Sequence, residues 1–227
     1  MKRTCGFYIV LMILLSVVGC TTDGYDTGDG KYSKMRAEFV EIHADKNKRA
    51  DYAVTDNSEQ LIVDNPFTLS WMTKADSTYR ALLYYNPVAT SSSVIGASVV
   101  SAVRVPVLPA VDEEEYEKIK TDPLTFESVW LSLNKKYLNI GFSLKTGRTD
   151  DDAAKHSLGI IVDGTTIMDD GSRCAELRLY HDQGSIPEYY SVRGWASVRL
   201  SDINADAVRI RINSYKGEVT KVFNLNQ

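Results

Sequence analysis

Cysteine is scarce in this sequence, which holds three in 227 residues: Cys5, Cys20 and Cys174. The N-terminal signals described below predict that Cys5 leaves with a signal peptide and that Cys20 carries lipid. Cys174 is then alone, so no intrachain disulfide can form. A lone cysteine is more often a small buried apolar residue than a reactive thiol. The fold must therefore depend on buried sheet faces rather than on disulfides.

The sequence also lacks the motifs of common catalytic sites. It has no Gly-x-Ser-x-Gly elbow, Walker loop or dinucleotide fingerprint. His43, His156 and His181 have no short metal-ligand spacing, and we expect each at the surface or at a strand end. His181-Asp182 and Asp150-Asp151-Asp152 offer metal-binding atoms, but strand neighbours point to opposite sides and an acidic loop tip is usually only solvated. We therefore expect no enzyme, no metal site and no cofactor.

A basic surface is missing as well. Lysine and arginine number 26 against 30 aspartate and glutamate residues, for a net charge of −4. Removal of Lys2 and Arg3 with a signal peptide would make the mature chain more acidic still. We therefore expect no nucleic-acid partner, because such proteins present a basic patch.

No apolar run is long enough to cross a bilayer comfortably. The run Phe7–Val18 would cover about 18 Å as a helix, against a hydrocarbon core of about 30 Å. Together with the positive head Lys2-Arg3, it has the pattern of a secretory signal peptide, residues 1–19. Val17-Val18-Gly19-Cys20 resembles the bacterial lipobox, in which cleavage before the cysteine follows its lipidation. Cleavage elsewhere, giving a soluble secreted protein, is the alternative.

Residues 20–33 are rich in Gly and Asp without apolar periodicity, which predicts a lipidated Cys20 followed by a flexible tether. Asp23, Asp26 and Asp29 miss the spacing of a calcium loop. Acidic residues behind a lipidated cysteine also resemble the signal that sends lipoproteins of some Gram-negative bacteria to the outer face of the outer membrane. The expected location is thus the outer membrane at the cell surface, with the periplasmic face as the alternative.

Apolar residues alternate with polar ones between Met35 and Val107, a period typical of strands. Three short strands are expected around Phe39, Val54 and Val63, and two longer ones over Tyr79–Tyr85 and Val94–Val105. Five strands in about 75 residues suit a small closed barrel. We predict an OB-like β-barrel over residues 34–109, in an all-β protein.

Residues 110–124 are predicted to be a linker with one short helix. Asp112 offers an N-cap and Glu115 the reciprocal residue of a capping box, and Thr121-Asp122-Pro123 would end the helix. Alternation then resumes over residues 125–227, where about seven strands predict an immunoglobulin-like β-sandwich. The cysteine and tryptophan framework of antibody domains is absent.

Aromatic residues supply the candidate contact site. Strand phase places Trp130 and Trp195 on outward faces, where they would pack against the first domain, cover a sheet face or contact a ligand. Pro187-Glu188-Tyr189-Tyr190 could add an aromatic platform for a sugar ring or a peptide. Tyr189, Tyr190 and Trp195 are therefore the candidate ligand or partner contacts.

The order of these features resembles the NigD-like lipoproteins. The matching features are Cys20, the Asp23-Gly24-Tyr25-Asp26 tether, the strand pair Val129-Trp130-Leu131 and Tyr137–Phe142, and the later strand Glu176–His181. The resemblance implies an OB-like barrel followed by a β-sandwich, no assigned catalytic activity, and a family named from a bacteriocin-linked gene cluster. No functional residue carries over beyond Cys20.

The sequence thus predicts a non-enzymatic, lipid-anchored outer-membrane lipoprotein. It would bind the membrane through Cys20. Its sandwich would present a binding surface to an unknown protein, either in a role related to bacteriocin immunity or as an accessory to a surface system. The alternative is a surface glycan-binding module that uses the exposed aromatic residues.

Overall fold

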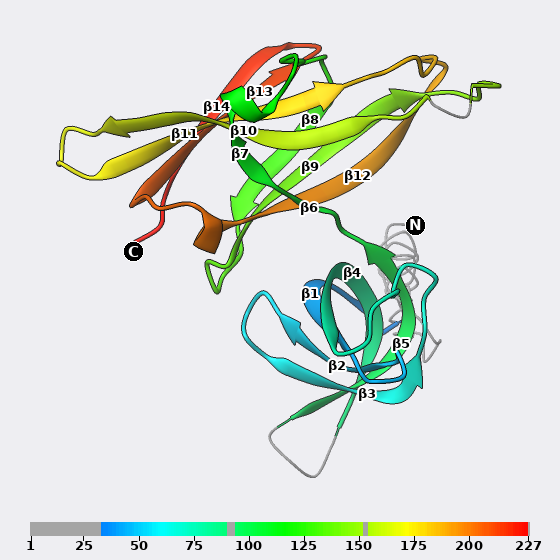
Figure 1. Cartoon of the computed structure of the whole chain (residues 1–227). Coiled ribbons are helices and arrows are strands. Elements are labelled where there is room, and N and C mark those ends of the chain that lie inside the picture. Colours follow the sequence, from blue (N-terminus) through cyan, green and yellow to red (C-terminus); the bar gives the residue numbers. More distant parts are fainter. Residues whose placement is uncertain (1–32, 90–93, 152–153, 227) are drawn as a thin grey trace, which may run out of the picture. The chain divides into compact units, whose positions relative to one another are not determined.

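Strands form nearly all of the regular structure in the computed structural model, which describes residues 33–89, 94–151 and 154–226 (Figure 1). The predicted signal peptide, Cys20 and the tether up to residue 32 lie outside the described residues. Met35–Gln227 forms one compact unit, which holds a barrel followed by a sandwich. The all-β prediction, with a barrel before a sandwich, is confirmed.

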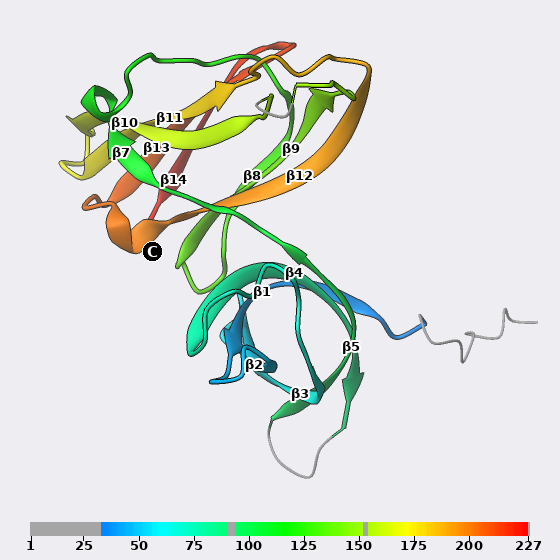
Figure 2. The same cartoon turned by 45° about the vertical axis from the view of Figure 1, so that its right-hand side comes forward.

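The first five strands close into a barrel in the order β1-β2-β3-β5-β4, which Figure 2 shows as a ring. They are β1 (Arg36–Ala44), β2 (Ala50–Thr55), β3 (Gln60–Phe67), β4 (Ser77–Val88) and β5 (Ile95–Arg104). All neighbours are antiparallel except β3 and β5, whose parallel pairing closes the ring. Alternation turns Ile42, Leu61, Leu83 and Tyr85 inward, where they are fully buried.

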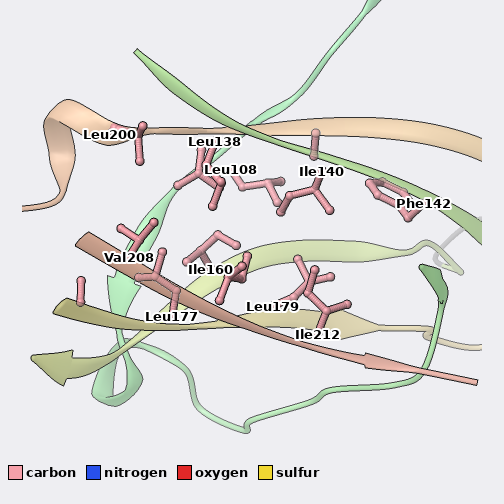
Figure 3. Close-up of a cluster of buried hydrophobic side chains, with 14 of the residues drawn as sticks. Leu108, Leu138, Ile140, Phe142, Ile160, Leu177, Leu179, Leu200, Val208 and Ile212 are labelled. Atoms are coloured by element: carbon pink, nitrogen blue, oxygen red, sulfur yellow. The ribbon is translucent and has the colours of Figure 1, made fainter. Parts of the chain in front are cut away.

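The remaining nine strands form two sheets of a sandwich, in the orders β14-β13-β11-β10-β7 and β6-β12-β9-β8. Their bounds are β6 (Val107–Leu108), β7 (Ala110–Asp112), β8 (Thr125–Leu131), β9 (Tyr137–Thr146), β10 (Ser157–Ile167), β11 (Arg173–Asp182), β12 (Tyr190–Arg199), β13 (Ala207–Ser214) and β14 (Gly217–Asn224). Leu138 and Ile140 of one sheet face Leu177 and Val208 of the other across a single apolar core (Figure 3). Burial of such faces is the main stabilising contribution in a sandwich whose cysteine, Cys174, is free.

The stretch expected to be a helical linker has a different structure. β6 pairs with β12 and β7 pairs with β10, so both short strands extend the sheets of the sandwich. The expected helix is only the three-residue 3-10 turn η1 (Glu113–Glu115), and the side chain of Asp112 makes no capping hydrogen bond. Val107-Leu108 and Ala110-Val111 pair with the open edges of the two sheets, and this tertiary pairing outweighs the local capping pattern.

A buried polar network joins the barrel to the outer face of the β12-β9-β8 side of the sandwich. Arg80 of β4, whose side chain is 1% exposed, donates two hydrogen bonds to the carboxylate of Asp56 at 2.6 and 2.7 Å. The same guanidinium donates to Asn139 Oδ1 at 3.1 Å and to Ser197 Oγ at 3.3 Å. Asn139 Nδ2 completes the network by donating to Asp56 Oδ2 at 3.2 Å. The network satisfies most of the hydrogen-bonding capacity of a guanidinium that is removed from water.

Aromatic rings surround this network. Phe39 of β1 makes edge-to-face contacts with Trp130 and Trp195, at centroid distances of 5.4 and 6.4 Å. The Arg80 guanidinium lies 4.2 Å from the centre of the Tyr137 ring, a cation–π distance. The two outward tryptophans therefore pack against the barrel, one of the arrangements that strand phase predicted.

A histidine pair links β11 to the segments that precede β8 and β10. His181 is 1% exposed, and its Nδ1 lies 2.9 Å from the carbonyl oxygen of Asp122, so this nitrogen carries the proton. His181 Nε2 then accepts a hydrogen bond from His156 Nδ1 at 3.1 Å, which leaves His156 Nε2 unprotonated. In the described part of the chain this nitrogen is buried without a partner. Burial, and next the neighbouring His181, lower the pKa of His156 from its ordinary value of 6.5.

The buried ion pair predicts a large stability loss on truncation. We expect Arg80→Leu to lower the free energy of unfolding by about 3 kcal/mol, because it leaves the Asp56 carboxylate partly buried without its cation. Adding Asp56→Asn should recover part of that loss. Urea unfolding measures both, and Arg104→Leu, at an exposed arginine of β5, should stay within about 0.5 kcal/mol. Equal losses for Arg80→Leu and Arg104→Leu would contradict the assignment.

The histidine pair predicts a pH dependence of stability. The unfolded chain protonates His156 near pH 6.5, whereas the folded chain binds this proton only at lower pH. The free energy of unfolding should therefore fall as the pH drops below about 6.5, until the folded pKa is passed. His156→Asn keeps a donor for His181 but cannot titrate, so its slope between about pH 7 and 5 should be shallower. An unchanged slope, or an equal change in a His43→Asn control, would be inconsistent with this.

Candidate functional site

Exposed apolar side chains gather where β12 begins. Tyr189, Tyr190 and Val192 are 78%, 57% and 51% exposed. Tyr190 and Val192 lie on the face of β12 that is fully buried further along, at Ala196 and Val198. The strand therefore extends beyond the sandwich core, which leaves apolar side chains uncovered.

A side chain from the opposite sheet contacts Glu188, the residue before Tyr189. Tyr215, in the turn between β13 and β14, is 39% exposed, and its hydroxyl donates to Glu188 Oε1 at 3.3 Å. Lys145 Nζ lies 2.8 Å from Glu188 Oε2 and 4.1 Å from the centre of the Tyr215 ring. We call Tyr189, Tyr190, Val192 and Tyr215 the tyrosine patch.

Charge and backbone both fix the tyrosine patch in place. The hydrogen bond from Lys145 lowers the pKa of Glu188, and the same contact raises the pKa of Lys145, so both groups stay charged at neutral pH. A Cβ at Gly147 would lie 2.7 Å from Tyr189 Cδ2 and 2.9 Å from the carbonyl oxygen of Pro187. The lack of a side chain at Gly147 thus allows the Tyr189 ring and Pro187 to approach β9.

Trp195 does not gather with the two candidate tyrosines. It lies on the other face of β12 from Tyr190, five residues or about 17 Å along the strand, and one side of it is occupied by Phe39. A ligand or partner contact at Trp195 stays a prediction, as do those at Tyr189 and Tyr190. Two members of the tyrosine patch could not be predicted as contacts from the sequence. Val192 shares the phase of core residues, and the closeness of Tyr215 to Glu188 depends on the pairing of distant strands.

The other candidate groups have structural partners. Cys174 is a free, fully buried cysteine, as predicted. Asp182 accepts a hydrogen bond from Lys120 Nζ at 2.7 Å, which lowers the pKa of its carboxyl group. Across residues 33–89, 94–151 and 154–226, no three His, Cys, Asp or Glu side chains come close enough together to hold a metal ion. In the same part of the chain, no helix has the length and apolar character needed to span a membrane.

Three solved structures from Bacteroides species share this fold. A protein of unknown function from Bacteroides vulgatus is 19% identical with a TM-score of 0.65, and the match covers 85% of this chain and 92% of that one. A NigD-like immunity protein from Bacteroides caccae is 21% identical with a TM-score of 0.61, covering 82% and 91%. A protein from Bacteroides fragilis named as a candidate lipoprotein is 11% identical with a TM-score of 0.60, covering 85% and 99%.

At these identities the likeness shows the fold alone. No curated protein matches the chain. The model of the NigD-like C-terminal β-sandwich domain matches residues 106–225, more than half of the chain, and its start agrees with the pairing of β6 and β7 into the sandwich. The chain therefore belongs to the NigD-like family.

Proposed function

We propose that this protein is a non-enzymatic lipoprotein, anchored in the outer membrane through Cys20, that presents a protein-binding surface in a bacteriocin-immunity-related role. The observation that carries the binding role is the tyrosine patch. Two further findings support the lipoprotein and immunity parts of the proposal. The chain belongs to the NigD-like family, and proteins of the same fold are named as an immunity protein and a candidate lipoprotein.

The chemistry of the tyrosine patch suits a protein partner. Tyrosine offers a large ring with few rotatable bonds and a hydroxyl that can donate or accept, and tyrosine is enriched at protein interfaces. Tyr189 and Tyr190 are the most exposed of the patch, and the neighbouring Lys145–Glu188 pair adds one charge of each sign. A partner would bury the rings and Val192, and meet the charges at the rim.

We propose no catalytic activity because the polar side chains that could act as acids or bases are already bonded to other groups. The carboxylate of Asp56 is paired with Arg80, and that of Asp182 with Lys120. His181 has both ring nitrogens in hydrogen bonds, to His156 and to the carbonyl of Asp122. In the described part of the chain these groups stabilise loops and the barrel–sandwich junction, which leaves them poorly placed to act as acids or bases on a substrate.

A glycan-binding surface module is the second candidate. The exposed faces of Tyr189 and Tyr190 could stack on a sugar ring, and the Tyr215 hydroxyl could accept from a sugar hydroxyl. The protein-binding role is favoured because Val192, on the same face of β12 as Tyr190, extends the surface with an apolar group that has nothing to bond to a sugar hydroxyl.

Lipid anchoring predicts the behaviour of two cysteine variants. Cys20→Ala should abolish labelling by an alkyne-tagged palmitate and release the protein from outer-membrane fractions, because the remaining chain has no acyl group. Cys5→Ala should keep both properties, since Cys5 would leave with the signal peptide. Persistent labelling of Cys20→Ala would contradict the anchor at this residue.

The binding role predicts a crosslinking pattern on whole cells. A benzophenone amino acid in place of Tyr190 should give one discrete crosslinked protein, and adding Tyr189→Ser should lower the yield at least tenfold, as expected for an interface hot spot. Ile167, 68% exposed at the end of β10, provides the matched control position and should give no product. Equal products from both positions would contradict a specific surface, and a product that glycosidases remove would favour the glycan module.

A further inference from the structure

A hollow of about 510 Å³ lies at the other end of β12, where β12, the β8–β9 turn and the end of β14 meet. This volume is within the range of ordinary ligand sites. Arg199 ends β12 and lines the hollow, whereas Tyr190 begins the strand. The nine residue steps between them span about 30 Å, so the hollow is separate from the tyrosine patch.

The floor of the hollow is apolar and preformed. Leu200 is 6% exposed and belongs to the sandwich core, and Ile203, Ala205 and Leu225 pack against the same core while remaining partly exposed. Backbone hydrogen bonds fix these segments: Leu200 N–H donates to the carbonyl of Lys136 at 2.9 Å, and Leu225 N–H to that of Asp206 at 2.8 Å. A small apolar group could be buried here without rearranging the backbone.

The rim of the hollow is cationic, although the chain as a whole is acidic. Glu41 is the only carboxylate among the lining residues, and it is already satisfied by Lys136 Nζ at 2.8 Å and the Tyr137 hydroxyl at 2.7 Å. Lys135 Nζ donates to the neutral carbonyl of Leu225 at 3.2 Å. Arg199 donates a hydrogen bond to the Tyr137 hydroxyl. Within the described residues neither Lys135 nor Arg199 has an ion-pair partner, so two positive charges lie beside the apolar floor without a carboxylate of their own.

We propose that this hollow, the Arg199 pocket, binds the C-terminus of a protein partner whose last side chain is apolar. The free carboxylate would lie between Lys135 and Arg199, and the last side chain would cover Leu200 and Ile203. A carboxylate complements the two unpaired cations, and a planar guanidinium can bond both of its oxygens. This inference deepens the protein-binding function proposed above and relies on it only for the partner being a protein.

The test uses the purified full chain in detergent and a fluorescein-labelled peptide ending in Gly-Ser-Gly-Leu with a free carboxylate. Fluorescence anisotropy should show saturable binding, and the same peptide with a C-terminal amide should bind at least tenfold more weakly, because a charge-assisted contact is lost. A peptide ending in Gly should also bind more weakly, since it leaves the floor uncovered.

Variants locate the binding site. Arg199→Gln and Lys135→Asn should each weaken binding of the free-acid peptide severalfold. Asparagine is chosen at residue 135 because it tolerates the positive φ of 54° there. Lys46→Gln, at an exposed lysine in the β1–β2 turn, should bind as the unchanged chain does. Thermal unfolding checks that each variant is folded.

Three results would overturn the proposal: equal affinity for acid and amide, unchanged binding by folded Arg199→Gln, or tighter binding of octanoate than of the peptide. None of these depends on crosslinking at Tyr190. The Arg199 pocket can therefore fail while the tyrosine patch stands, and the reverse is also true.

Discussion

The ion pair between Arg80 and Asp56 is the interaction on which the rest of this structure depends. A buried pair contributes little net stability, because desolvation offsets most of the attraction, but its geometry is demanding. Arg80 also bonds Asn139 and Ser197 of the sandwich, so moving the barrel on the sheet would break hydrogen bonds of a buried guanidinium. The aromatic rings around the ion pair bury apolar area, and the polar network fixes how the barrel is positioned on the sheet. Glu41 of the barrel is thereby held beside Lys136 and Tyr137, where it completes the rim of the Arg199 pocket.

The same packing decides where a partner can bind. The inner face of the sheet that holds β12, β9 and β8 covers the core. The middle of its outer face, with Trp130 and Trp195, packs against the barrel. The two ends of β12 are left uncovered by this packing. The tyrosine patch lies at the first end because the strand runs past the core, and the Arg199 pocket lies at the second because the chain turns away at η2 (Leu200–Asp202). The candidate binding surfaces are thus the parts of one strand that folding leaves uncovered.

The sequence predicts what depends on local periodicity and misses what depends on distant pairing. Alternation was enough to predict the closed five-stranded barrel, the sandwich and the outward tryptophans. It could not predict the Arg80 network, because an outward arginine in β4 reads as a solvated residue until Ser197, 117 positions away, is known to lie beside it. The His156–His181 contact and Tyr215 were hidden for the same reason. The acidic turn after Asp112 shows the converse, since a local helix pattern yielded to strand pairing at open edges.

Two contacts on one strand constrain the kind of partner that could use both. A β-strand held between neighbours is stiff, so the tyrosine patch and the Arg199 pocket stay about 30 Å apart. A single sugar ring or a short peptide cannot span that distance, whereas a folded protein with a free C-terminus can. Each contact alone covers a few side chains and would be weak. When one molecule makes both, the second contact forms at a high effective concentration, and the affinity rises without any new interaction. A bidentate arrangement of this kind needs a rigid spacing, and β12 supplies it because the strand is paired with β9 along its whole length.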